Sequence, residues 1–215
     1  MTKTRILLLT GPVGGGKTTV AERVVRLARR QRLACGGLLA PALLDADGHK
    51  VGIWGMDLSS GERRILARTD RTLGGPRLGP YSFDAGALDW AVAVVMGALP
   101  SGGARSSPPL AGGPALDPER SEGEGTEGGY SKLLVVDEIG TLELWYGQGL
   151  APILPRLAAG DAARALVIVR DLLLDELQRR LVPVAQIVFS VSQQNRGTLP
   201  AQILEALFKQ GPSRP

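Results

Sequence analysis

The feature that most constrains this chain is a glycine-rich segment, GPVGGGKTT, at residues 11–19. It follows the aliphatic run RILLLT at residues 5–10 and leads into a stretch, Lys17 to about Arg32, whose apolar residues are spaced for one buried helix face. An ordinary turn needs glycine but has no use for a lysine and two threonines directly after it. The segment matches the P-loop pattern, and a strand before it and a helix after it are the context that this pattern requires.

The P-loop pattern predicts a phosphate-binding site. Glycines let successive backbone N–H groups point inward around a phosphate, and the helix N-terminus adds partial positive charge. We expect Lys17 to reach the β- and γ-phosphates, Thr18 to ligate Mg²⁺ and Thr19 to contact the α-phosphate. The residues expected to bind nucleotide are Gly11, Pro12, Val13, Gly14, Gly15, Gly16, Lys17, Thr18 and Thr19.

A second motif, LLVVDE at residues 133–138, ends an aliphatic run in two acids. The run predicts a buried strand, which places Asp137 at the carboxyl end of that strand, where open α/β sheets bind their ligands. We expect Asp137 to hold Mg²⁺ through water. Glu138 is suited to orient an attacking water beside the γ-phosphate or to accept its proton. Lys17 and Glu138 are therefore candidate catalytic residues.

The rest of the chain predicts a single α/β domain spanning residues 1–215, with a mostly parallel sheet flanked by helices. Expected strands lie at 132–137, 165–169 and 186–190, and expected helices at 88–99, 150–158, 172–181 and 199–208. Residues 36–67 are short extended pieces separated by turn formers, which predicts a small antiparallel hairpin or meander attached to the sheet. Residues 100–131 are rich in glycine, proline, serine and glutamate, so we expect a disordered insertion there.

Charge, cysteine content and apolar runs indicate which partners and which cellular compartment to expect. The net charge is +4, and the excess is N-terminal: residues 1–99 carry 14 Lys and Arg against 8 Asp and Glu. Much of it lies on the predicted helix after the P-loop as a solvated face, without an aromatic stacking motif, which argues against a nucleic-acid partner. The lone Cys35 is expected to be a buried small hydrophobe in a reducing compartment. No apolar run reaches the roughly 18 residues of a membrane span, so we expect a cytoplasmic protein.

Several segments together resemble one family. They are the P-loop, GHKVGIWGMDLSSGERRILAR, LGPYSFD, VVDEIGTLEL and VFSVSQQNRGTLPAQIL, in that order. This order is similar to that of the cancer-related/THEP1-type nucleoside-triphosphatases over almost the whole chain except residues 100–131. The resemblance implies a RecA-like P-loop core that hydrolyses ATP, GTP and other nucleoside triphosphates slowly with Mg²⁺, with water as the acceptor.

The resemblance also implies roles for three further residues. Glu143 corresponds to the second acid of the family's DEIG-x-x-E stretch and is a candidate catalytic residue. Asn195 and Arg196 correspond to a late Asn-Arg pair, which we expect near the base or sugar because loops after such strands border the nucleotide crevice. A turn at the entry to the last helix is an equally good interpretation of this pair. The chain departs from the family in GGLLAPALL, which lacks the hydroxyl and acid of the family's Gly-Phe-x-Thr-Glu.

Three activities are compatible with these motifs. The first is a Mg²⁺-dependent nucleoside triphosphatase, the second a nucleoside or nucleotide kinase, and the third a nucleotide-dependent switch or assembly factor with slow hydrolysis. The kinase interpretation is weakened because no arginine cluster follows Val167, where an arginine-bearing lid is expected. Arg63, Arg64 and Arg170 are candidates for an arginine that stabilises charge near the γ-phosphate, and the sequence does not select among them.

Overall fold

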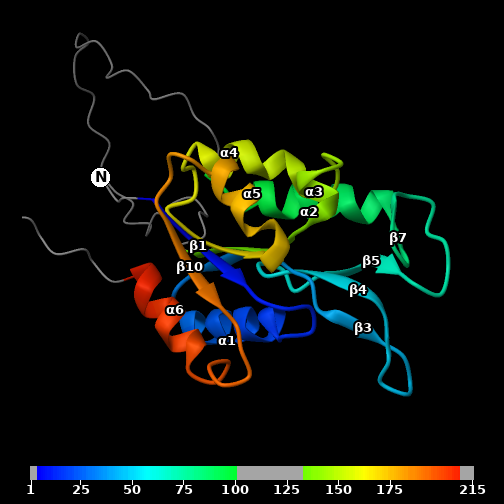
Figure 1. The fold of residues 1–215 in the computed structure, drawn as a ribbon, viewed down its shortest axis with the longest axis horizontal. Coiled ribbons are helices and arrows are strands. Elements are labelled where there is room, and N and C mark those ends of the chain that lie inside the picture. Colours follow the sequence, from blue (N-terminus) through cyan, green and yellow to red (C-terminus); the bar gives the residue numbers. More distant parts are fainter. Residues whose placement is uncertain (1–3, 101–132, 209–215) are drawn as a thin grey trace, which may run out of the picture.

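The computed structural model describes residues 4–100 and 133–208 (Figure 1). Apart from Pro100, the predicted insertion at 100–131 lies outside these residues. The described strands are β1 Arg5–Thr10, β2 Cys35–Leu39, β3 Ala42–Leu44, β4 Lys50–Asp57, β5 Arg63–Arg68, β6 Arg77–Leu78, β7 Tyr81–Phe83, β8 Leu133–Ile139, β9 Arg164–Val169 and β10 Gln186–Ser190. The described helices are α1 Lys17–Arg30, α2 Ala85–Gly97, α3 Thr141–Leu144, α4 Leu154–Ala158, α5 Leu174–Arg180 and α6 Leu199–Phe208, with 3₁₀ turns η1 Ala151–Ile153 and η2 Asp171–Leu173.

The strands form one sheet in the order β10-β1-β9-β8-β2-β4-β5-β7-β6, with β3 paired to β4. The first five in this order are parallel, as the alternation of strands and helices predicts, and the others are antiparallel. Strand β9 separates β1 from β8: Val167 pairs with Leu8 on one side and with Val136 on the other. The carboxyl ends of β1 and β8 therefore emerge at the same edge of the sheet.

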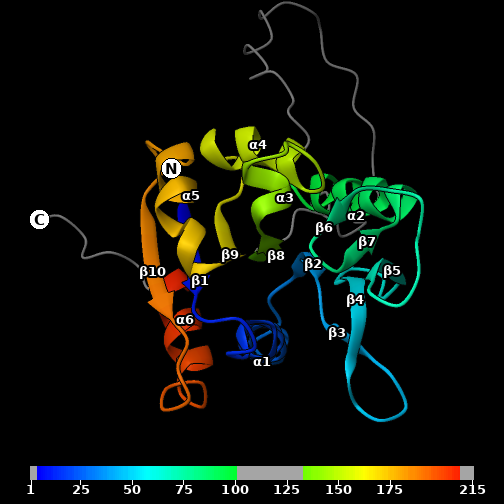
Figure 2. The same ribbon diagram turned by 45° about the vertical axis from the view of Figure 1, so that its right-hand side comes forward.

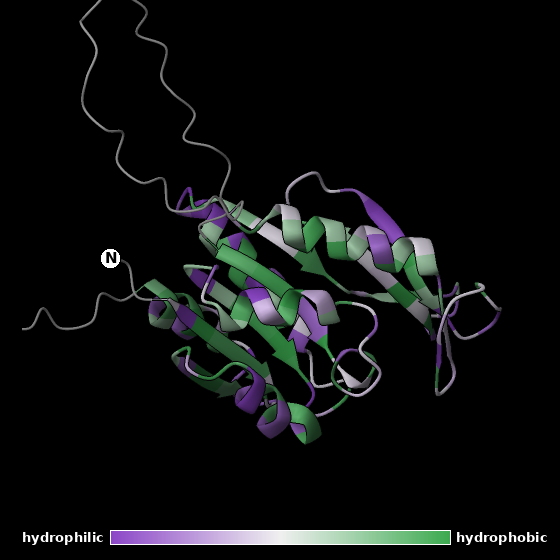
Figure 3. Cartoon of the chain, turned by 90° about the horizontal axis from the view of Figure 1, so that it is seen from above, coloured by the Kyte–Doolittle hydropathy of each residue, from purple (hydrophilic) through white to green (hydrophobic). Residues whose placement is uncertain are grey.

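Helices cover both faces of the parallel half, which gives three layers. Alternate residues of β1 separate the two cores: Leu7 and Leu9 face α1 and α6, whereas Ile6 and Leu8 face α2, α4 and α5. All four side chains are fully buried. Figures 1 and 2 show α1 and α6 together below the sheet and the other helices above it. The strands of the parallel half are mainly apolar along their length, while the helices carry both polar and apolar residues (Figure 3).

Strand β2 joins the antiparallel segment expected within residues 36–67 to the parallel sheet. It pairs in parallel with β8, is buried throughout, and only its far side pairs antiparallel with β4. The pairing needs glycine: Gly37 has φ +97°, and a Cβ there would lie 2.1 Å from the Val135 carbonyl oxygen. The expected antiparallel hairpin is confirmed in β3, β4 and β5, and it is larger than expected because β6 and β7 extend it.

Helix α2 begins at Ala85, three residues before the expected start. The Asp84 carboxylate accepts a hydrogen bond from the Ala87 N–H at 2.7 Å, which caps the first turn. Cys35 is buried, as expected. Every helix among the described residues is too short or too polar to cross a membrane.

Candidate nucleotide-binding site

The glycine-rich segment forms the connection between β1 and α1. Gly11 has φ +139°, and a Cβ there would lie 2.9 Å from the Val191 carbonyl oxygen, so the β10 end packs directly against the start of the loop. Gly16 has φ +91° and immediately precedes the first helical residue, Lys17. Glycine conformations of this kind allow the loop to turn into the helix with its N–H groups facing inward. Val13, in the loop, is 80% exposed.

Lys17 is buried within the loop that it follows. Its ammonium donates hydrogen bonds to the Gly11 carbonyl at 2.9 Å and to the Pro12 carbonyl at 3.1 Å. The side chain is thus folded back over the loop, and its positive charge lies among the same residues whose amides are available for an anion. This arrangement suits binding of a phosphate chain.

The two sequence motifs meet at Asp137, at the end of β8. The buried Asp137 carboxylate accepts hydrogen bonds from the Thr18 hydroxyl and from the Ala40 N–H, the latter at 3.0 Å. Burial raises the pKa of Asp137 to about 7, against the lowering effect of these two hydrogen bonds and of Lys17. The start of α1, the end of β8 and the end of β2 therefore converge on one carboxylate.

The oxygens of Thr18 and Asp137 have the chemistry of a magnesium site. Mg²⁺ prefers hydroxyl, carboxylate and water oxygens. Because burial disfavours the charged form of Asp137, a divalent cation beside it would offset the cost of that charge. The donor set thus fits the metal that the P-loop pattern implies.

Glu138 is paired with Arg170, the residue that follows β9. The Arg170 Nε donates to the Glu138 Oε1 at 2.7 Å, and the two side chains are 39% and 26% exposed. Of the three candidate arginines, Arg170 contacts a predicted site residue, whereas Arg64 pairs with Glu62 and lies over a tryptophan ring. Arg63 lines a cavity beside α1. The sequence could not select Arg170, because its place beside Glu138 depends on the position of β9 next to β8.

Glu143 uses both carboxylate oxygens on backbone groups. Its Oε2 accepts from the Gly140 N–H at 2.8 Å and its Oε1 from the Leu150 N–H at 3.3 Å. Burial raises its pKa above the usual value. A Cβ on Gly140 would lie 3.5 Å from Glu143 Oε2 and 3.9 Å from Glu138 Oε1, so the two acids approach each other across this glycine. In this arrangement Glu143 secures the turn that follows β8.

Asn195 shapes the loop between β10 and α6. Its Oδ1 accepts from the Ser192 N–H and its Nδ2 donates to the Ser190 carbonyl, both at 2.8 Å. This loop borders the P-loop, because the Val191 N–H donates to the Thr10 carbonyl at 2.9 Å. The Arg196 side chain is exposed. These contacts are those of a loop-shaping residue, and contact of the pair with a base or sugar stays a prediction.

The contact from Ala40 is one that sequence reasoning missed. Ala40 lies in GGLLAPALL, the stretch that departs from the family by lacking a hydroxyl and an acid. The contact to Asp137 comes from the backbone N–H instead, which every residue except proline supplies. No side-chain pattern could have indicated it.

Comparisons with known proteins agree with this architecture. A family described as NTPase matches residues 6–100. The nucleoside-triphosphatase THEP1 of Ignicoccus hospitalis is 38% identical over 81 residues, covering 38% of this chain and 46% of that protein. That of Methanopyrus kandleri is 36% identical over 75 residues, covering 35% and 40%. The chain thus spans less than half the length of these two relatives.

Longer matches are more distant in sequence. The nucleoside-triphosphatase THEP1 of Hyperthermus butylicus is 26% identical over 202 residues, covering 94% of this chain and 90% of that protein. The crystal structure of THEP1 from Aquifex aeolicus matches with a TM-score of 0.61 and 17% identity, covering 95% of this chain and 99% of that one. At this identity the structural match shows a shared fold, with a P-loop sheet flanked by helices.

Proposed function

Because this chain belongs to the THEP1-type nucleoside-triphosphatase family, we propose that it hydrolyses nucleoside triphosphates to nucleoside diphosphate and phosphate. The observation that carries the proposal is the meeting of Thr18 and the Ala40 N–H at the Asp137 carboxylate. It brings the end of the P-loop against an acid near the end of β8, although β9 lies between β1 and β8. Phosphate-binding amides and paired carboxylates are thereby combined in one site.

In this site the loop amides and Lys17 bind the β- and γ-phosphates, and Thr19 contacts the α-phosphate. Thr18 and Asp137 are the residues that would hold Mg²⁺. The metal, when bound, neutralises charge that develops on the phosphate oxygens. We expect Asn195 and Arg196 near the base or sugar, and the resemblance to the family implies that ATP, GTP and other nucleoside triphosphates are substrates.

Glu138 orients the attacking water and takes its proton. The water oxygen forms a bond to the γ-phosphorus as the bond between this phosphorus and the β–γ bridging oxygen breaks, and the diphosphate leaves with the bond electrons. Arg170 is a positioning residue, because its hydrogen bond fixes the orientation of the Glu138 carboxylate. Glu143 is a positioning residue, because its carboxylate holds the turn after β8 rather than contacting the substrate.

Phosphate release from ATP, GTP, CTP and UTP, with Mg²⁺ or with EDTA, tests the proposal. We expect release with every triphosphate, without an added acceptor, and its loss in EDTA. A kinase would release little phosphate until an acceptor is added. Turnover that rises many-fold only when a cellular partner is supplied would instead favour a switch or assembly factor.

A further inference from the structure

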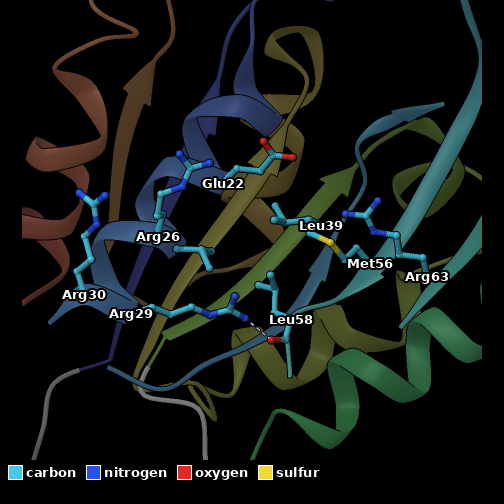
Figure 4. Close-up of a pocket in the computed structure, with 9 residues that line it drawn as sticks. Glu22, Arg26, Arg29, Arg30, Leu39, Met56, Leu58 and Arg63 are labelled. Carbon is cyan, nitrogen blue, oxygen red and sulfur yellow. Dashed lines mark hydrogen bonds between the residues drawn. The ribbon is translucent and has the colours of Figure 1, made fainter. Parts of the chain in front are cut away.

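A cavity of about 580 Å³ lies between α1 and the antiparallel half of the sheet, and its lining contains none of the P-loop residues 11–19 (Figure 4). Its lining residues are Glu22, Val25, Arg26, Arg29, Arg30, Leu39, Met56, Leu58 and Arg63. Val25, Leu39 and Leu58 are at most 4% exposed and make an apolar floor. Figure 4 shows Arg26 and Glu22 on the α1 side and Arg63 on the opposite side, with Leu39 and Met56 between them.

The lining of this cavity carries an excess of positive charge, with Arg26, Arg29, Arg30 and Arg63 against the single carboxylate of Glu22. Arg29 is engaged, since it donates to the Leu58 carbonyl across the lower end of the cavity. Within residues 4–100 and 133–208, the side chains of Arg26, Arg30 and Arg63 make no hydrogen bond or ion pair. Seven other arginines in the described part of the chain pair with carboxylates. Three guanidinium groups without a partner among the described residues are thus gathered around one cavity.

The size of the cavity and the side chains that line it indicate which class of ligand it binds. Its volume lies within the roughly 300–1,000 Å³ of small-molecule sites. Arginine binds phosphate through charge-assisted, often bidentate hydrogen bonds. Among the residues that the structure describes, no aromatic side chain lines the cavity, so this lining lacks the stacking platform on which single-stranded nucleic acids bind. An apolar floor beneath separated cations fits a molecule that is apolar in its body and anionic at its edge.

We propose that this cavity binds a small organic phosphate monoester. The phosphate lies between Arg26 and Arg63, and the apolar body of the ligand lies on Leu39, Met56 and Leu58. The site is separate from the triphosphate site and does not depend on the proposed hydrolysis. Leu39 directly precedes Ala40, whose N–H binds Asp137, so the floor of the cavity and the nucleotide site share the end of β2.

Calorimetric titration with 1-naphthyl phosphate tests this site. We expect saturable binding of one molecule per chain, and much weaker binding of inorganic phosphate, which lacks the body, and of 1-naphthol, which lacks the charge. The double substitution Arg26→Gln and Arg63→Gln should weaken binding at least about tenfold. The matched control, Arg71→Gln with Arg179→Gln, removes the same charge from exposed ion pairs elsewhere and should leave binding unchanged.

A Lys17→Ala variant separates this site from the P-loop. Binding should survive Lys17→Ala; if it is lost there and kept in the double variant, the ligand occupies the P-loop and the proposal is wrong. Absence of saturable binding also overturns it. Binding of a short RNA that the double variant abolishes, without binding of naphthyl phosphate, would assign the arginines to a nucleic acid instead. Should the double variant fail to fold, Arg63→Gln alone carries the test.

Discussion

At the end of β8, the Glu138 carboxylate is held by one guanidinium, and this contact makes its proposed role testable. Glu138→Gln keeps the size of the side chain and an oxygen that can accept from Arg170, but it cannot take a proton from water. We expect kcat to fall by about 10²–10⁴-fold, with Mg·ADP affinity nearly unchanged. Phosphate release and calorimetric titration measure the two effects.

The matched control for this substitution is Glu62→Gln, which changes an exposed carboxylate that pairs with Arg64 far from the β8 end. It should hydrolyse at the parental rate. If Glu138→Gln did so as well, Glu138 would not be the general base.

Arg170 is expected to act on kcat rather than on substrate affinity. Its removal frees the Glu138 carboxylate to rotate, and misplacement of a reacting group by about 1 Å can cost about 10²-fold in rate. Arg170→Ala should therefore lower kcat by about that factor, with KM nearly constant, and Arg170→Lys should recover part of the loss. A rise in KM at constant kcat would show that Arg170 binds phosphate instead of positioning Glu138.

At the scale of elements, the Glu143 side chain fixes α3 to the turn after β8. Because this side chain is buried, the stability of the folded chain should depend on pH. Burial raises the pKa of Glu143 above 4.5, so the folded chain keeps a proton that the unfolded chain has lost. The contribution of this group to stability is complete below about pH 4.5 and declines as the pH rises toward the folded pKa. Stability of the parent protein should fall over that interval for this reason.

Glu143→Gln removes this titration and one backbone acceptor. At pH 5 the variant should be less stable than the parent by about 1–3 kcal/mol, because the Gly140 and Leu150 N–H groups share one remaining oxygen. The difference in unfolding free energy between the variant and the parent should shrink toward pH 8, because only the parent loses stability as this group titrates. Urea unfolding at both pH values measures it. A deficit that grows with pH would mean that the pKa of Glu143 is not raised.

Helices and strands that depend on local sequence patterns could be predicted. Strands that depend on pairing with a distant part of the chain could not. The aliphatic runs of β1 and β8 and the helical spacing of α1 are local, and each lies close to where the sequence places it. The residues CGGLL of β2 have weak strand propensity, and their parallel pairing depends on β8, far along the chain. The short strands β6 and β7 give no periodic signal at all.

The same distinction holds within the site. The P-loop spacing and the position of two acids after an aliphatic run predict that Thr18 and Asp137 approach a common ligand, and the structure brings these two residues together. The contacts from Ala40 and Arg170 required knowledge of which strands neighbour β8. Sequence reasoning identifies residues with a chemical signature, while strand order determines which of the remaining residues touch them.

At the scale of the whole molecule, the nucleotide site joins parts that the sheet order keeps apart. The P-loop follows β1, Asp137 lies near the end of β8, and the loop that packs against Gly11 follows β10. A ligand bound to all of these contacts the folded chain only, because unfolding separates them. Binding of Mg·ADP should therefore stabilise the entire domain rather than a single loop.

With Mg·ADP at 100 times its Kd, the expected stabilisation is about 2.7 kcal/mol, or roughly 5–11 °C in Tm for a domain of this size. Lys17→Ala should abolish most of this shift, because the buried ammonium is removed from the loop. Lys50→Ala, which removes an exposed lysine beside Tyr81, should keep it. Scanning calorimetry with and without ligand gives the shift for each variant separately, so any change in intrinsic stability cancels. An equal shift in Lys17→Ala would place the nucleotide outside the P-loop, since no other described contact would then explain the coupling of ligand to fold.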